Sequence, residues 1–108
     1  LILSLAALCL ALAAPANAKV DVITANEDLA WVTRAVGGNL VSVDYLASSN
    51  QDPHVIEPRP SQVAKLSRAK MLVRIGMDLD IWLDTLLRRA GNGNIMPNGR
   101  GYVDASRG

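Results

Sequence analysis

Short apolar runs alternate with longer segments in which apolar residues recur at helical spacing. The β-branched run at 20–24 predicts a first strand, and the alternating run at 40–46 predicts a second. Residues 71–75 predict a third strand and residues 102–104 a fourth. Because helical segments separate these runs, the pattern predicts an α/β fold, with a parallel sheet flanked by helices on both faces.

The first helical segment has a clear start and a clear stop. Asn26 is a good N-cap residue, and the pair Gly37-Gly38 is expected to end the helix. Its apolar stripe, expected to face the sheet, consists of Leu29, Val32 and Val36. The two tryptophans, Trp31 and Trp82, occupy helical positions, and we expect both to lie in the core.

The last helical segment is the most regular element of the pattern. Its apolar residues recur at intervals of three and four, namely Leu79, Trp82, Leu83, Leu86, Leu87 and Ala90. Asp78 and Asp80 lie at its start, where negative charge favours a helix N-terminus, so we interpret them as helix-capping residues rather than acid–base groups. Gly91 ends this helix, and a shorter helix is expected over 61–69.

The N-terminal segment differs from the rest of the chain. Residues 1–18 carry no charge and are apolar up to Pro15, but the run is too short for a membrane-spanning helix, which needs ~20 residues. Ala16-Asn17-Ala18 places small residues where a signal peptidase cleaves. The sequence therefore predicts a signal peptide over 1–18, cleaved after Ala18, with Cys9 removed on processing.

The remaining residues, 19–108, contain no cysteine and keep the formal net charge of +1. Export without disulfides favours a periplasmic protein that depends on a hydrophobic core. Acidic and basic residues are interspersed, with no basic stripe and few aromatic side chains, which argues against a nucleic-acid partner. We expect a monomer, formed by one small α/β domain or by part of a larger protein.

The single histidine of the chain, His54, lies between the second predicted strand and the second helix, on a segment with three prolines. Proline fixes φ and biases the preceding residue away from helix, so we expect an extended loop. Ligands of parallel sheets bind at the carboxyl ends of the strands, where this loop begins. An imidazole there is suited to act as a metal ligand or a general base. Asp52 and Glu57 are candidates to orient the ring, and solvated carboxylates fit them equally well.

A catalytic site has weaker support, and we expect that the chain is not an enzyme. No serine lies in a nucleophile-elbow pattern, and the glycines match no phosphate-binding loop. An exported hydrolase that uses His54 as its base remains an alternative. It would need a nucleophile such as Ser48, Ser49 or Ser61 within hydrogen-bond reach of the ring.

The run 51–69, in which Asp-Pro-His is followed by Glu-Pro-Arg-Pro-Ser, resembles the signature of the cluster A-I substrate-binding proteins of zinc and manganese ABC transporters. Residues 24–30, 75–80 and 102–108 resemble further segments of this family, in the same order and spacing. The resemblance covers essentially all of 19–108.

The resemblance implies an exported receptor with two α/β lobes joined by one long helix, which captures Zn²⁺, or alternatively Mn²⁺, between the lobes and delivers it to a membrane permease. Residues 19–108 would be an incomplete N-terminal lobe and His54 the first metal ligand. The other ligands, one or two histidines and a carboxylate, would come from beyond residue 108. Because zinc prefers about four ligands, we expect the fragment alone to bind it weakly. An adhesin with the same fold is the alternative.

Overall fold

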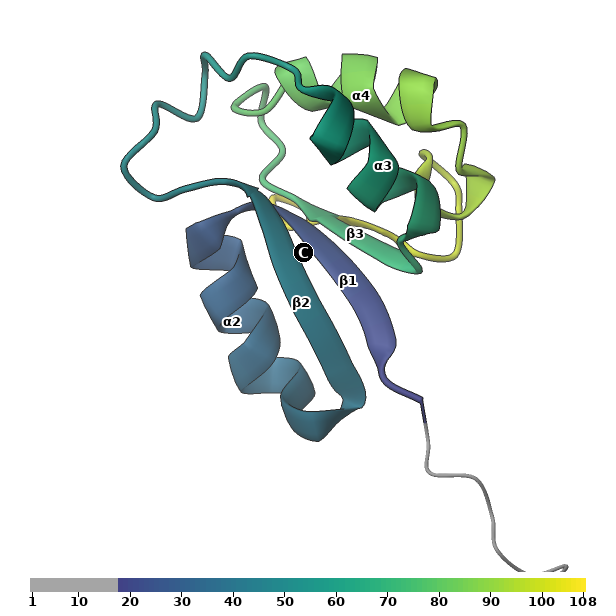
Figure 1. Cartoon of the computed structure of the whole chain (residues 1–108). Coiled ribbons are helices and arrows are strands. Elements are labelled where there is room, and N and C mark those ends of the chain that lie inside the picture. The colour runs from purple at the N-terminus through teal and green to yellow at the C-terminus, as the bar shows by residue number, and fades with distance from the viewer. Residues whose placement is uncertain (1–17) are drawn as a thin grey trace, which may run out of the picture.

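A four-stranded parallel sheet forms the centre of the molecule, with the strand order β2-β1-β3-β4 (Figure 1). The computed structural model describes residues 18–108, so the predicted signal peptide lies outside the described residues apart from Ala18. The α-helices and strands in chain order are β1 (Val20–Asn26), α2 (Glu27–Gly37), β2 (Val41–Ala47), α3 (Pro60–Arg68), β3 (Met71–Arg74), α4 (Trp82–Ala90) and β4 (Tyr102–Asp104).

The order of the strands places β1 inside the sheet, between β2 and β3. The chain first moves from β1 to β2 and then returns past β1 to reach β3. The first connection thus leads to the strand on one side of β1, and the second leads to the strand on its other side. Open α/β sheets bind ligands outside the carboxyl ends of the strands where connections diverge in this way. The connection that passes this point is the loop with His54.

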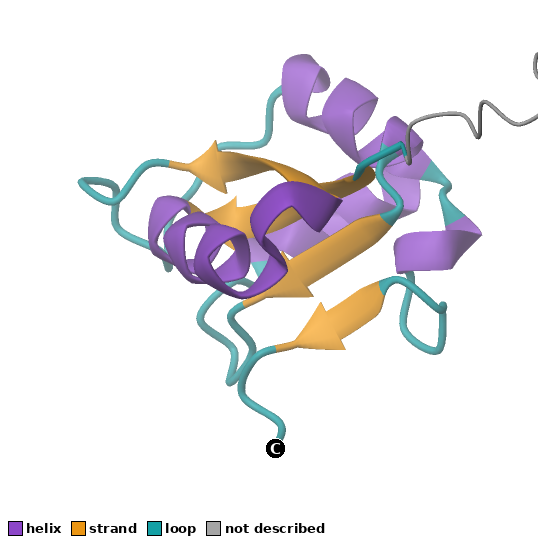
Figure 2. Cartoon of the chain, turned by 90° about the horizontal axis from the view of Figure 1, so that it is seen from below, coloured by secondary structure: helices purple, strands orange, loops and turns teal. Residues whose placement is uncertain are grey.

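Helices pack on both faces of the sheet, as the sequence predicts (Figure 2). In β1, Val22, Ile23, Thr24 and Ala25 are all buried, although successive side chains of a strand point to opposite faces. Helix α2 contacts β1 and β2, whereas α3 and α4 pack against each other. A strand buried on both faces is typical of a parallel sheet between two layers of helices.

The face covered by α3 and α4 holds the main hydrophobic core. Each fully buried leucine contributes about 2 kcal/mol through the removal of apolar surface from water. The core residues are Ile23, Ala25, Leu66, Ala69, Leu72, Leu83, Leu86, Leu87 and Ile95. Trp82 packs against this cluster from its edge, in agreement with the prediction that it lies in the core.

The other face is covered less completely, and here the prediction for Trp31 is wrong. Trp31 is 73% exposed, and Val32 and Val36 are exposed as well. Ala30, which directly precedes Trp31, is fully buried and marks the side of α2 that packs on the sheet. Among the strands of the described sheet, α2 packs mainly on β1 and β2. The sheet beneath α2 is therefore too narrow to cover the apolar side chains that lie further around the helix.

The ends of α2 agree with the prediction, but the start of α4 does not. The Asn26 side chain accepts a hydrogen bond from Leu29 N at 3.0 Å, and the helix ends at Gly37. Helix α4 begins only at Trp82, because Met77 and Asp78 have positive φ angles of 52° and 62° and belong to a turn. No helix within residues 18–108 has the length and apolar character needed to cross a membrane.

The prediction that Asp80 caps the last helix is wrong. The Asp80 carboxylate is fully buried and accepts a hydrogen bond from the backbone N–H of Ile75 at 2.6 Å. The same carboxylate pairs with the Arg74 guanidinium at 2.8 Å. Asp80 therefore fixes the turn between β3 and α4 rather than the first turn of the helix.

Candidate metal site

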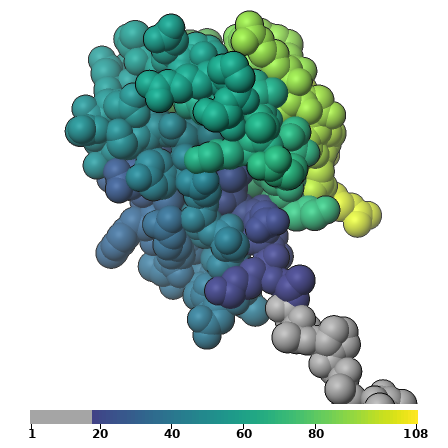
Figure 3. Space-filling view, in the orientation of Figure 1, coloured from purple at the N-terminus to yellow at the C-terminus, as the bar shows by residue number. Residues whose placement is uncertain are grey.

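The loop from Ser48 to Arg59, here called the His54 loop, joins β2 to α3 along the carboxyl edge of the sheet (Figure 1). It forms part of the molecular surface in the space-filling view, where its residues are teal (Figure 3). The loop ends extended at Arg59, as predicted, with φ −122° and ψ 144°. Within it, Val55 N donates a hydrogen bond to Asp52 O at 3.2 Å, so His54 lies in a tight turn rather than in a fully extended segment.

The imidazole of His54 is on the surface, with its side chain 61% exposed. Its Nδ1 lies 2.8 Å from Asp52 Oδ1, and its backbone N–H donates to the same oxygen at 2.9 Å. The backbone hydrogen bond from His54, followed by the ring contact, holds the pKa of Asp52 below its usual range. Asp52 is therefore an ionised acceptor at neutral pH, so the proton of this contact belongs to Nδ1 of the ring.

This tautomer decides what the ring can do. A neutral imidazole protonated at Nδ1 carries its lone pair on Nε2, which is then available to a metal ion. A carboxylate that accepts from the other ring nitrogen is the usual support of a metal-binding histidine. Asp52 thus takes the orienting role that the sequence suggested for it. Within residues 18–108, Glu57 makes no hydrogen bond to the ring and stays an exposed carboxylate.

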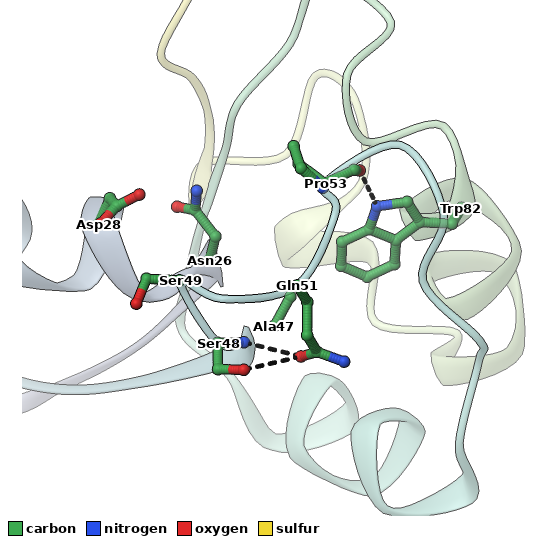
Figure 4. A pocket seen from close by; sticks show the side chains of 8 residues that line it. All are labelled: Asn26, Asp28, Ala47, Ser48, Ser49, Gln51, Pro53 and Trp82. Carbon is green, nitrogen blue, oxygen red and sulfur yellow. Dashed lines mark hydrogen bonds between the residues drawn. The ribbon is translucent and has the colours of Figure 1, made fainter.

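Side chains from the three α-helices α2, α3 and α4 hold the His54 loop in place. Ser49 N donates to Glu27 Oε2, at the start of α2, at 3.0 Å. The indole N–H of Trp82, at the start of α4, donates to Pro53 O at 2.8 Å (Figure 4). Gln62 of α3 accepts from the last amide of the loop at 2.8 Å and donates to a carbonyl of β2 at 3.2 Å.

A small cavity lies behind the loop, at the carboxyl ends of β1 and β2 (Figure 4). Its volume is about 60 Å³. Sites for organic ligands usually have volumes of roughly 300–1,000 Å³, so this space suits water molecules rather than an organic substrate. The lining residues are Asn26, Asp28, Ala47, Ser48, Ser49, Gln51, Pro53 and Trp82.

The described part of the chain supplies one imidazole and no complete metal site. Residues 18–108 contain no group of three or more histidine, cysteine, aspartate and glutamate side chains placed to hold a metal ion. The hydrolase alternative gains no support either. Ser48 Oγ donates to Asn50 Oδ1 at 2.6 Å, and no serine hydroxyl in this part of the chain is bonded to the His54 ring.

A second polar cluster at the same edge was not predicted from the sequence. Arg74, at the end of β3, is 8% exposed, and its guanidinium contacts Asp80, Asp84 and the Tyr102 hydroxyl at 2.8, 2.8 and 3.1 Å. Burial disfavours its charge, but the hydrogen bonds that the guanidinium donates to Asp80, Asp84 and Tyr102 outweigh burial and raise the pKa of Arg74. The signal in the sequence is a single arginine in the otherwise apolar run Met71–Arg74.

Comparison with known proteins gives a consistent result. A family model described as the periplasmic zinc-uptake complex component A, ZnuA, matches residues 22–108. The manganese ABC transporter substrate-binding lipoprotein PsaA of Streptococcus pneumoniae is 32% identical over 76 residues, which are 67% of this chain and 24% of PsaA. The iron ABC transporter substrate-binding lipoprotein MtsA of Streptococcus pyogenes serotype M1 is 30% identical over 76 residues, with the same shares of the two chains.

A crystal structure of ZnuA superposes with a TM-score of 0.64 and 33% identity, over 69% of this chain and 30% of that one. The chain thus spans about a quarter of the length of the two relatives and less than a third of the solved structure. PsaA and MtsA are both named as substrate-binding proteins of transporters, a class of binding proteins rather than enzymes. The chain therefore belongs to the ZnuA family, the metal ABC transporter substrate-binding proteins of cluster A-I that its sequence resembles.

Proposed function

We propose that residues 19–108 form the N-terminal lobe of an exported, monomeric metal receptor of the periplasm, with residues 1–18 as its signal peptide. The receptor captures a divalent metal ion in the cleft between two lobes and delivers it to the membrane permease of an ABC transporter. Membership of the ZnuA family and the names of the relatives support this proposal. The adhesin and hydrolase alternatives receive no comparable support.

The observation that carries the proposal is the pairing of His54 with Asp52. The 2.8 Å contact at Nδ1 orients an exposed ring and directs the lone pair of Nε2 away from its own loop carboxylate. We propose that His54 is the ligand that this lobe contributes and that Asp52 holds it in the metal-binding tautomer. The remaining ligands come from other segments of the receptor, because one imidazole cannot retain zinc tightly.

We propose Zn²⁺ as the transported ion and Mn²⁺ as the alternative. The matching family model is described for zinc uptake, whereas the named relatives carry manganese and iron in their names. A neutral imidazole suits zinc and iron as well as other transition metals, so ligand number and type in the complete site decide among them.

The proposal is tested in a two-lobe receptor that carries this sequence, with Zn²⁺ titrated into the metal-free protein by calorimetry. His54→Ala is expected to lower zinc affinity by about 100-fold or more, because it removes the imidazole that donates to the metal. Asp52→Asn is expected to lower it by about tenfold, because it removes the carboxylate that orients the ring. Glu57→Gln is the matched control, since this loop carboxylate does not contact the ring. Unchanged affinity in His54→Ala would refute the ligand assignment.

A further inference from the structure

The peptide unit between Pro53 and His54 is held at both of its polar atoms. Its carbonyl oxygen accepts a hydrogen bond from Trp82 Nε1 at 2.8 Å. Its N–H donates to Asp52 Oδ1 at 2.9 Å, and the same carboxylate oxygen contacts Nδ1 of the His54 ring. Because a peptide unit is planar, a rotation that breaks the bond to Trp82 also displaces the N–H from Asp52.

The hydrogen bond from Trp82 restrains ψ of Pro53, the soft dihedral angle on the proline side of this peptide. Proline fixes its own φ, so the orientation of the Pro53 carbonyl depends on ψ of Pro53. The indole N–H determines that angle from outside the loop, across 29 residues of sequence. Without it, the Pro53–His54 peptide can turn, and the shared Asp52 oxygen then loses the backbone donor that fixes its position beside the ring.

The packing around Trp82 fixes the position of its indole. Trp82 is the first residue of α4, it is partly buried, and it packs against the core beside Leu83, which is fully buried. The ring lies over the cavity behind the loop, with its nitrogen directed at Pro53 (Figure 4). Because packing already fixes this donor on a helix, the side chain loses little conformational entropy when it bonds to the loop, which is the usual benefit of a preorganised site.

We propose that Trp82 is a positioning residue for the metal ligand His54, acting through the Pro53–His54 peptide and Asp52. This inference rests on the proposed function of His54 as a metal ligand. The chain contains a natural control in Trp31, which is 73% exposed and lies on the opposite layer of helices.

The first test uses the 108-residue chain without metal, in which His54 is the single histidine. The ¹⁵N chemical shifts of its ring at pH 8 report the tautomer of the neutral imidazole. The proton is expected mainly on Nδ1 in the unmodified chain and in Trp31→Phe. In Trp82→Phe a larger fraction of Nε2–H is expected. Identical ring shifts in all three proteins would overturn the proposal.

The second test measures zinc affinity by calorimetry in the two-lobe receptor. Trp82→Phe is expected to weaken binding about tenfold, as is usual for the loss of a group that supports a ligand, whereas Trp31→Phe is expected to leave it within about twofold. Benzothienylalanine at position 82 replaces the N–H with sulfur at nearly constant shape, and it should reproduce the loss without lowering the melting temperature of the metal-free receptor.

The outcomes separate the two proposals. Loss of affinity in His54→Ala with unchanged affinity in Trp82→Phe overturns the positioning role and leaves the metal ligand in place. Unchanged affinity in both variants overturns both. If Trp82→Phe loses both zinc affinity and melting temperature, and benzothienylalanine at position 82 loses neither, the role of Trp82 is purely structural. That outcome also overturns the inference.

Discussion

Two of the connections that leave the carboxyl edge of the sheet, those after β2 and β3, are built in opposite ways. The His54 loop, after β2, keeps its functional side chain 61% exposed and is held by single hydrogen bonds from three helices. The turn after β3, residues 75–81, is organised around Asp80, whose carboxylate is fully buried and bonded to Arg74 and to the backbone. One connection carries the proposed metal ligand at the surface, and the other buries a charged pair inside the protein.

The difference indicates how a buried turn can support an exposed side chain such as the proposed ligand His54. Asp80 lies two residues before Trp82, so the buried turn fixes the start of α4 and thereby the indole that contacts the loop. The buried turn is thus linked to the loop through the hydrogen bond between Trp82 and Pro53. Substitutions in the turn should therefore affect mainly stability, and substitutions in the loop mainly metal affinity.

The largest effect is expected from Arg74→Met. This change leaves the Asp80 carboxylate buried without its cation, and breaking a buried pair from one side usually costs about 3–5 kcal/mol in the free energy of unfolding. Urea denaturation measures the loss. The matched control is Lys65→Met, which removes an exposed partner of Asp44 at 2.8 Å and should cost less than about 1 kcal/mol. Equal losses in the two variants would contradict the contrast between buried and exposed charge.

A smaller loss of stability is expected from Gly76→Ala, also in the turn. Gly76 has a φ of +81°, and an added Cβ would collide with the Asp104 carboxylate and the Ser106 hydroxyl. Strain of this kind costs about 2–3 kcal/mol, which a shift in the melting temperature would reveal. Gly91→Ala is the control, because its φ is +61° but the space around it is open, so about 1 kcal/mol is expected. An equal effect at both glycines would show that crowding at the turn is unimportant.

Glu27→Gln should weaken the loop with little effect on the fold. The charged oxygen that accepts from Ser49 N at 3.0 Å becomes a neutral amide, and the cost to stability should stay below about 1 kcal/mol. Faster hydrogen exchange of the Ser49 amide is the measurement. Asp28→Asn removes the same charge from the first turn of α2, so it controls for the helix dipole. Equal acceleration in both variants would argue against a specific contact.

The smallest effect concerns acid. Asp104 accepts from the Ser106 hydroxyl at 2.6 Å and from its N–H at 2.9 Å, and these bonds hold the pKa of Asp104 below its ordinary value. The unfolded carboxyl therefore binds a proton at higher pH than the folded one. Its contribution to stability is complete above the ordinary value, ~4, and is lost as pH falls through the lowered one. Urea midpoints between pH 5 and 2 should fall less steeply in Asp104→Asn. An unchanged slope would contradict this assignment.

Much of the fold follows from the sequence because its signals are local. The order of strands and helices and the Asn26 cap depend on residues within one turn or one strand, and the structure agrees with them. The start of α4 was predicted too early, since the stripe that includes Leu79 continues helical spacing into a turn. This turn contains the positive φ angles of Met77 and Asp78 and is held by Asp80, whose partner Arg74 lies in the preceding strand.

The candidate site was predictable only in part. His54 and Asp52 are neighbours in the sequence, so the possibility of a support for the ring was visible there, although its role as a ligand stays a prediction. The contact between Trp82 and Pro53 joins residues that no periodicity connects. The exposed position of Trp31 was also beyond local reasoning, because its environment depends on how much of the sheet lies beneath α2.

The placement of the two indoles gives the domain a built-in optical reporter. Trp31 faces solvent, whereas Trp82 is partly buried and bonded to the backbone beside the histidine. After replacement of Trp31 by phenylalanine, all tryptophan emission of this domain would originate beside the loop that carries the proposed ligand. Movement of that segment during loading and release of an ion would then change the wavelength and intensity of the light, without any added dye.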